Sequence, residues 1–402
     1  MITRADAELL VNSWAEAAAE RAGGGDWVGL LEEYDFGYVG WVKPPADGRP
    51  EPGSGVRSVI DRDSGDVIPW GSIPAPMVAE NYRAGRPPFA VPTVDPVMRI
   101  REQARPGLTM NTAASITLSF DRRMRTAYGA RGDHELNHHP VVREFLAAQP
   151  PGHTSRGADR HADLILISDV LHAHDAVSGA PTTLAAARRL FRGVVRFTTV
   201  RIRRPEAGSG GRAWQCHTCL AAWVHIGLYE AAILESFRPR HEPVVICLPR
   251  EDLPPELLAL GPDYLDDAEP GQPVSKWDEH WLRVNDRPLI RAKLEMMRQY
   301  GRVSTSGSVP GQVHRVEGVH VRPNAPATHD ELAAEFGRRL GVRAYGIGFE
   351  NGGEAVYVGD GHGRVFALDQ GGEWYLGGSL DEALVTVLYG RHQPKVRADG
   401  TW

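Results

Sequence analysis

The pattern of apolar and polar positions divides the chain into three regions. In the first, residues 1–88, the amphipathic text "MITRADAELLVNSWAEAAAERAGGG" predicts a short helix. "SVIDRDSGDVIPW" predicts two short strands around a Ser64-Gly65 turn, and "APMVAENYRAG" predicts a helix that ends at a glycine. We therefore expect a small α/β N-terminal module that ends near the proline-rich "RPPFAVPTVDP".

The middle region, residues 89–250, alternates strand and helix patterns. "LTMNTAASITLSF" and "MRTAYGA" predict a hairpin, and "GVVRFTTVRIR" and "EPVVICLP" predict further strands. Helices are predicted for "PVVREFLAAQ", "HADLILISDVLHAH", "PTTLAAARRLF" and "CHTCLAAWVHIGLYEAAILESF", the last broken or bent near Gly227. This alternation is typical of an α/β sheet with helices packed on it.

The third region, residues 251–402, starts irregularly and becomes regular towards its end. "KWDEHWLRVN" and "LIRAKLEMMRQYG" predict helices in the irregular stretch. Later, Thr328 and Ser379 each begin a capping-box pattern that opens a helix. Between these two helices lie four strand candidates, "AYGIGF", "EAVYVGD", "RVFALD" and "EWYLGG". The pattern predicts a small α+β domain made of a helix, a meander and a second helix.

Composition narrows the class of protein. The hydrophobic fraction of 42% and the charged fraction of 24% are ordinary for a soluble globular protein. The net charge of −6 argues against duplex nucleic acid as the main partner, because phosphate contacts need clustered basic residues. No apolar run is long enough to span a membrane, and the first residues lack the apolar core of a signal peptide. With only three cysteines a disulfide framework is excluded, and we expect a cytoplasmic protein.

The stretch "GDHELNHHPVV" contains an H-E-x-x-H pattern at residues 134–138. On a continuous helix this pattern would predict a zinc protease site. Pro140 disfavours helical backbone at His139, and Gly132 interrupts a helix upstream, so only about one turn would fit. We therefore interpret the stretch as a polar loop that enters a helix at Pro140.

A second pattern, the C-x-x-C of Cys216 and Cys219, stands where a strand and a loop give way to a helix. A helix start lowers the pKa of a thiol, and two thiolates at this spacing can bind one zinc ion. Cys247 lies in an apolar strand and is expected in the core. The remaining ligands would then be histidine or carboxylate. Taken alone, the C-x-x-C is also compatible with a redox pair or a chance spacing.

His161 and Asp163 supply the missing chemistry. They begin an apolar helix 55 residues before Cys216 (216 − 161). One histidine and two cysteines at two helix starts can hold zinc at one edge of a sheet, and a carboxylate two residues after the histidine can move protons. Zinc deaminases have this arrangement, with the signature H-x-E and P-C-x-x-C. Trp214 either stacks on a base or packs beside the helix.

Residues 105–250 resemble the cytidine-deaminase-like superfamily, and the YwqJ-like deaminases of bacterial polymorphic-toxin systems in particular. The matching text is "LTMNTAASITLSF", "HHPVVREFL", "HADLILISDVLH" and "WQCHTCLAAWVHIGL". The resemblance implies a deaminase-like three-layer α/β/α sheet, with Zn²⁺ bound by His161, Cys216 and Cys219 at two helix starts. It also implies that the loop carrying Asn137 and His138 borders the substrate, although for Asn137 itself we favour a plain turn residue over a substrate contact.

Two positions depart from the deaminase pattern. Asp163 stands where the family has glutamate, so the expected catalytic carboxylate is one methylene shorter. Gln215 stands where the family has proline. In addition, residues 315–392 resemble a SUKH-type immunity domain, with the matching text "GRVFALDQGGEWYLGGSLDEALVTVLYG".

Two functions follow from these observations. The first is zinc-dependent hydrolytic deamination of a nucleobase, nucleoside or nucleotide-like small molecule, and the acidic pI favours a small substrate over a long nucleic acid. The second is a catalytically degenerate deaminase-like scaffold whose SUKH-like domain binds a toxin or another protein partner. The expected domains are residues 1–88, residues 89–250 and residues 251–402, the last comprising linker helices and the SUKH-like domain.

Overall fold

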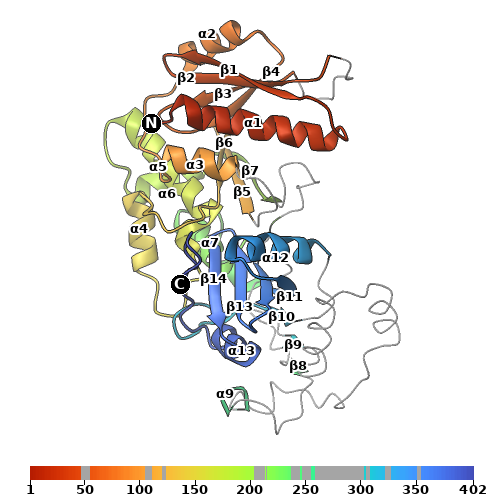
Figure 1. The fold of residues 1–402 in the computed structure, drawn as a ribbon. Helices are drawn as coiled ribbons and strands as arrows, with labels where there is room; N and C mark the ends of the chain where they lie inside the picture. Colours follow the sequence, from red (N-terminus) through yellow and green to blue (C-terminus); the bar gives the residue numbers. More distant parts are fainter. Residues whose placement is uncertain are drawn as a thin grey trace.

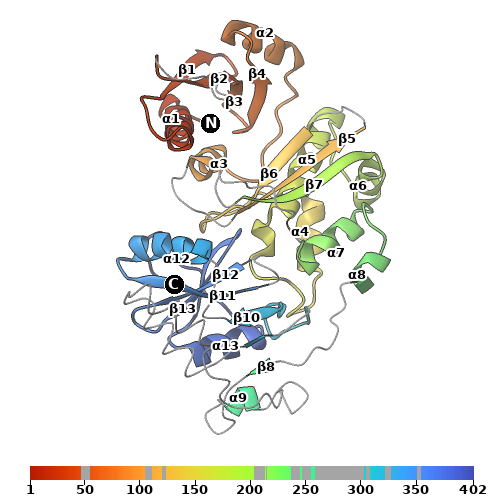
Figure 2. The same ribbon diagram turned by 90° about the vertical axis from the view of Figure 1, so that its right-hand side faces the viewer.

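A computed structural model describes the chain apart from residues 47–54, 105–110, 120–123, 203–212, 214, 237–244, 247–254, 259–302, 305–307, 322–326 and 351–354. Figures 1 and 2 show an N-terminal sheet with its helices, a middle part, and a C-terminal sheet with its helices. The described elements combine helices with three separate sheets, so the fold is mixed α/β as the sequence predicts. No helix in the described part of the chain is long and apolar enough to cross a membrane.

The N-terminal part is a four-stranded antiparallel sheet in the order β1-β2-β3-β4. Its elements are α1 (Arg4–Arg21), β1 (Val28–Tyr34), β2 (Gly37–Lys43), β3 (Arg57–Asp61), β4 (Val67–Gly71) and α2 (Ala75–Gly85). Tyr38 and Ile60 pack in the core with α1, whereas their neighbours Val39 and Val59 pack with α2. Because successive strand residues point to opposite faces, the two helices cover opposite faces of the sheet. The predicted turn at Gly65 is confirmed, with φ of 72°.

The middle part contains a three-stranded antiparallel sheet in the order β6-β5-β7. Its elements are α3 (Pro96–Gln103), β5 (Asn111–Leu118), β6 (Met124–Tyr128), α4 (Pro140–Ala147), η1 (Ala158–Arg160), α5 (Ala162–Ser178), α6 (Leu184–Phe191), β7 (Val194–Ile202), α7 (His217–His225) and α8 (Ala232–Ser236). α5 packs on β5 and β6 and also contacts α4 and α7. Its first ten residues are almost all buried, which accounts for the unbroken apolar text there.

The predicted hairpin, the four helices and the break at Gly227 in this region are confirmed. The strand predicted from "EPVVICLP" is present only as β8 (Val245–Ile246) in the described residues, and it pairs with β9 (Val303–Ser304) in the C-terminal sheet. A local pattern predicts a strand but does not choose its hydrogen-bonding neighbour. The deaminase-like three-layer sheet stays a prediction, since the three described strands do not define it by themselves.

The C-terminal sheet has seven described strands in the order β14-β13-β12-β11-β10-β9-β8. The remaining elements are α9 (Pro255–Leu258), β10 (Val319–Val321), α12 (Ala327–Leu340), β11 (Ala344–Glu350), β12 (Ala355–Asp360), β13 (Val365–Asp369), β14 (Gly372–Gly377) and α13 (Leu380–Leu388). Ser379 caps α13 as predicted, since its Oγ accepts the N–H of Glu382 at 3.2 Å. The helices expected in "KWDEHWLRVN" and "LIRAKLEMMRQYG" lie outside the described residues.

The two flanking parts share one architecture. Each has a helix, a four-stranded meander and a second helix: α1, β1 to β4 and α2 in one, α12, β11 to β14 and α13 in the other. In the C-terminal part Tyr357 packs in the core with α13, while Val356 and Val358 pack in the core with α12. The helices therefore cover opposite faces of the C-terminal sheet too.

Candidate metal centre

The histidine and the two cysteines singled out in the sequence lie at the starts of two helices that contact each other. His161 is the N-cap residue of α5, and its side chain makes no capping hydrogen bond. Cys216 is the N-cap residue of α7, where its Sγ accepts the N–H of Cys219 at 3.4 Å. Because α5 packs against α7, the two helix starts bring all three side chains together.

The three side chains form a compact group of ligand atoms. His161 Nδ1 lies 3.3 Å from Cys216 Sγ and 3.5 Å from Cys219 Sγ. All three ligand atoms lie within 4.8 Å of one another. Among the described residues, this is the one such group of three or more His, Cys, Asp or Glu side chains that could hold a metal ion. The residues of the H-E-x-x-H stretch do not belong to it.

The electrostatics of the group suit a metal that binds thiolates. Hydrogen bonding from Cys219 is the main reason that the pKa of the Cys216 thiol lies well below its usual range, and the charge of His161 adds to this against the effect of burial. Burial alone would lower the pKa of His161, but the neighbouring Cys216 thiolate raises it to about 9. Imidazole and thiolate are ligands that zinc takes in proteins, so the donor set fits zinc.

Asp163 is buried, and one of its carboxylate oxygens accepts hydrogen bonds from two neighbouring side chains. Its Oδ1 accepts a hydrogen bond from the Trp223 indole N–H at 2.7 Å and another from the Gln215 amide at 2.5 Å. Burial raises the pKa of the Asp163 carboxyl, although both hydrogen bonds favour its charged form. Gln215 is thus a direct partner of Asp163, and both residues differ from the zinc-deaminase signature.

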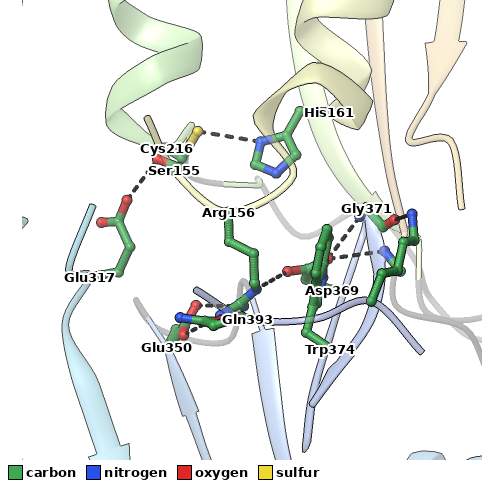
Figure 3. Close-up of polar contacts among 12 residues, drawn as sticks. Ser155, Arg156, His161, Cys216, Glu317, Glu350, Asp369, Gly371, Trp374 and Gln393 are labelled. Atoms are coloured by element: carbon green, nitrogen blue, oxygen red, sulfur yellow. Dashed lines mark hydrogen bonds and ion pairs between the residues drawn. The ribbon is translucent and has the colours of Figure 1, made fainter. Parts of the chain in front are cut away.

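A cavity of about 40 Å³ lies beside His161 and Cys216. One water molecule needs at least about 10–15 Å³ by the same measure, so the space holds a few waters and is too small for a nucleobase ring. Most of its lining comes from the C-terminal domain, including Glu317, Glu350 and Asp369. Figure 3 shows these three residues on the C-terminal side, across from His161 and Cys216. The C-terminal domain therefore closes much of the space in front of the candidate metal centre.

Two of the predicted substrate residues, Asn137 and His138, do not line this cavity. Asn137 is exposed, and its backbone binds Thr93 and His172. His138 is buried and donates from Nε2 to the carbonyl oxygen of Asp159 at 2.6 Å. Both precede α4, in the non-helical stretch that Pro140 predicts. Trp214 lies outside the described residues.

Comparison with known families gave two matches, both of immunity type. Residues 270–390 match the family described as SUKH-3 immunity protein, and residues 5–87 match the family described as Immunity protein 35-like domain. Comparison with curated proteins and with solved structures gave no match. The predicted SUKH-type resemblance of the C-terminal region is confirmed, whereas the immunity-type character of the N-terminal part was not predicted. The deaminase resemblance of the middle region stays a prediction.

The residues that the sequence did not reveal are those that join the domains. Arg156 stands in the polar stretch "GHTSRGADR", which shows neither helical nor strand periodicity. In the structure it is buried against the C-terminal domain, five residues before His161. An arginine close to a candidate metal-ligand histidine was the available signal, but its partners lie about 200 residues away in sequence, at Glu350 and Asp369.

Proposed function

We propose that the protein is an immunity-type protein that binds a protein toxin through its flanking domains. The observation that carries this proposal is the similarity of both flanking regions, residues 5–87 and residues 270–390, to immunity-protein families. Their shared arrangement of helix, meander and helix supports it, because two domains of one architecture offer two related surfaces for recognition. The net charge of −6 suits a basic toxin, whose association it would accelerate.

In this proposal the middle region is a scaffold that holds Zn²⁺ with His161, Cys216 and Cys219. Zinc bound there would cross-link the starts of α5 and α7, and its binding energy would stabilise the folded state. Two features favour a scaffold over an enzyme. Trp223 and Gln215 hold the Asp163 carboxylate, and the adjoining cavity is too small for a base.

Co-expression tests the protein-binding function. The full chain would be expressed in bacteria together with each of a panel of nuclease and deaminase toxin domains, and growth would be measured. We expect growth to be restored for at least one toxin, which then co-elutes with the chain in gel filtration. An absence of both rescue and co-elution across the panel, combined with ammonia release from a base, would replace this proposal with the second candidate.

The second candidate is a zinc-dependent deaminase acting on a nucleobase, nucleoside or nucleotide-like small molecule. It is favoured by the convergence of three ligand side chains together with a carboxylate two residues after the histidine. Bound zinc would supply Lewis-acid chemistry. Asp163 would carry protons to the ring nitrogen and to the leaving amine, which requires its carboxylate to turn from Trp223 and Gln215 towards the cavity.

Measurements of metal content and of ammonia release distinguish the zinc-holding scaffold from the zinc-dependent deaminase. We expect about one zinc per chain in the purified protein, and loss of the metal in Cys216→Ala; less than about half an equivalent would argue against both zinc-based readings. Cytosine, adenine and guanine derivatives are the substrates to screen. Ammonia release that disappears in Asp163→Asn supports the enzyme, whereas release that is unchanged in this variant excludes the catalytic role of Asp163.

A further inference from the structure

The side chain of Arg156 extends from the middle region into the C-terminal domain. Its side chain is only 7% exposed. Its guanidinium donates from Nε to Asp369 Oδ2 at 2.8 Å, to both carboxylate oxygens of Glu350 at 2.9 Å, and to the Gln393 side-chain oxygen at 2.7 Å (Figure 3). Such forked bonding to carboxylates is specific to arginine, because lysine carries a single point charge.

The pocket that receives Arg156 is built by the C-terminal domain itself, and we call Glu350, Asp369 and Gln393 the arginine pocket. Glu350 accepts the Tyr357 hydroxyl at 2.6 Å. Asp369 Oδ1 accepts the Trp374 indole N–H at 2.9 Å and two backbone N–H groups of the turn that follows β13. These bonds fix both carboxylates in place without any help from the middle region. A pair of buried carboxylates so placed requires a cationic partner.

The N-terminal part contains a similar carboxylate. Asp61 ends the third strand of its meander, as Asp369 ends the third strand of the other. Asp61 Oδ1 accepts backbone N–H groups two and three residues later, at 2.9 and 3.0 Å, and the corresponding bonds of Asp369 are 2.9 and 3.1 Å. In both domains the other oxygen accepts an arginine Nε at 2.8 Å, from Arg86 in the first case.

The two domains differ in where the arginine comes from. Arg86 is the C-cap residue of α2, so the N-terminal domain supplies its own arginine. The C-cap residue of α13 is Tyr389, which has no guanidinium. The C-terminal domain therefore takes its arginine from outside, from the loop that leads to His161.

Neighbouring contacts place the whole loop against the C-terminal domain. Ser155 Oγ donates to Glu317 at 2.9 Å, and Gln370 accepts the N–H of Ala162 at 3.1 Å. Gly157 lies so close to Trp374 that an added Cβ would approach its ring to 2.6 Å. The loop and the C-terminal domain thus meet closely on both sides of Arg156, directly beside the candidate metal ligand His161.

We propose that the arginine pocket is the recognition site of the C-terminal domain, and that Arg156 occupies it within the same chain and so holds this domain over the His161–Cys216–Cys219 cavity. The partner chemistry that this site fits is an arginine presented on a protein loop. Release of Arg156 exposes Cys216 and frees the pocket for an arginine from another protein. The proposal rests on the domain contact and does not depend on the toxin-binding function or on catalysis.

Thiol labelling of the full chain tests the covering role. In the presence of a chelator, labelling by a bulky fluorescein maleimide and by small iodoacetamide is followed by mass spectrometry on the tryptic peptide that begins at Ala213. Fragment ions distinguish Cys216 from Cys219, which lies in the same peptide. The ratio of the maleimide rate to the iodoacetamide rate reports access of a bulky reagent to Cys216, because a change in thiol reactivity affects both rates. We expect this ratio to rise at least about tenfold in Arg156→Met. Arg86→Met is the matched control, since it empties the similar site far from the cavity, and we expect the wild-type ratio.

A folded Arg156→Met protein with the wild-type ratio would overturn the proposal. If Arg156→Met does not fold, Glu350→Gln weakens the same contact with little change of shape, and an unchanged ratio there would be equally decisive. Recognition of arginine itself is tested with a peptide of residues 152–159, in which Arg156 is the one arginine, added to the Arg156→Met protein. We expect this peptide to lower the ratio again, and the same peptide with methionine in place of arginine to have no effect. Equal effects of the two peptides would exclude arginine recognition.

Discussion

Asp163 offers the sharpest test of what the middle region is built for. One of its two carboxylate oxygens, Oδ1, accepts hydrogen bonds from both Trp223 and Gln215, and Trp223 is fully buried. Replacement by alanine leaves both donors without an acceptor. An unsatisfied buried donor costs about 1–3 kcal/mol. Trp223 becomes such a donor, whereas the half-buried Gln215 amide can bind water instead, so Asp163→Ala is expected to lose about 1–3 kcal/mol of unfolding free energy.

Asparagine is the matched replacement, because its side-chain oxygen can still accept from both Trp223 and Gln215. Asparagine carries no charge, so the variant avoids the cost of burying a charged carboxylate, which is what raises the pKa of Asp163. We therefore expect Asp163→Asn to lie within about 1 kcal/mol of the wild type. Urea unfolding followed by circular dichroism measures both variants. Equal losses in the two variants, or no loss in the alanine variant, would refute the view of Asp163 as a structural acceptor.

Two further predictions concern the cores of the flanking and middle parts. Burial alone would raise the pKa of Asp61, but hydrogen bonds from Arg86 and Tyr82 lower it. The stability that Asp61 contributes is therefore present above about pH 4 and is lost as pH falls through its folded-state pKa. Urea titrations at about pH 2–5 should show that the unfolding free energy of Asp61→Asn falls less with acid than that of the wild type. An unchanged pH dependence would contradict this role of Asp61. On α5, Leu164→Ala should cost about 2–5 kcal/mol in urea unfolding, because Leu164 is completely buried. Val177→Ala is the control on the same helix, with 63% exposure and an expected change within about 0.5 kcal/mol, and similar losses in both would contradict the described packing of α5.

Local sequence determined most of the elements in this protein. The continuous apolar text predicts the buried helix α5, the Ser379 capping pattern predicts the start of α13, and Pro140 excludes a helix at His139. These features depend on residues a few positions apart, where backbone sterics and capping hydrogen bonds act. The same local signals placed His161 and Cys216 at helix starts, as the structure confirms, so the sequence alone indicated a candidate metal centre.

Tertiary structure decided how these elements meet. β8 carries a strand pattern, but its pairing with β9 depends on the fold of a distant segment. Arg156 carries no periodic signal, and its burial follows from carboxylates at Glu350 and Asp369 that only a folded meander brings together. Charge pairing over such sequence distances leaves no local trace. The sequence therefore predicted a candidate metal centre, and the packing of the C-terminal domain determined that this centre is covered.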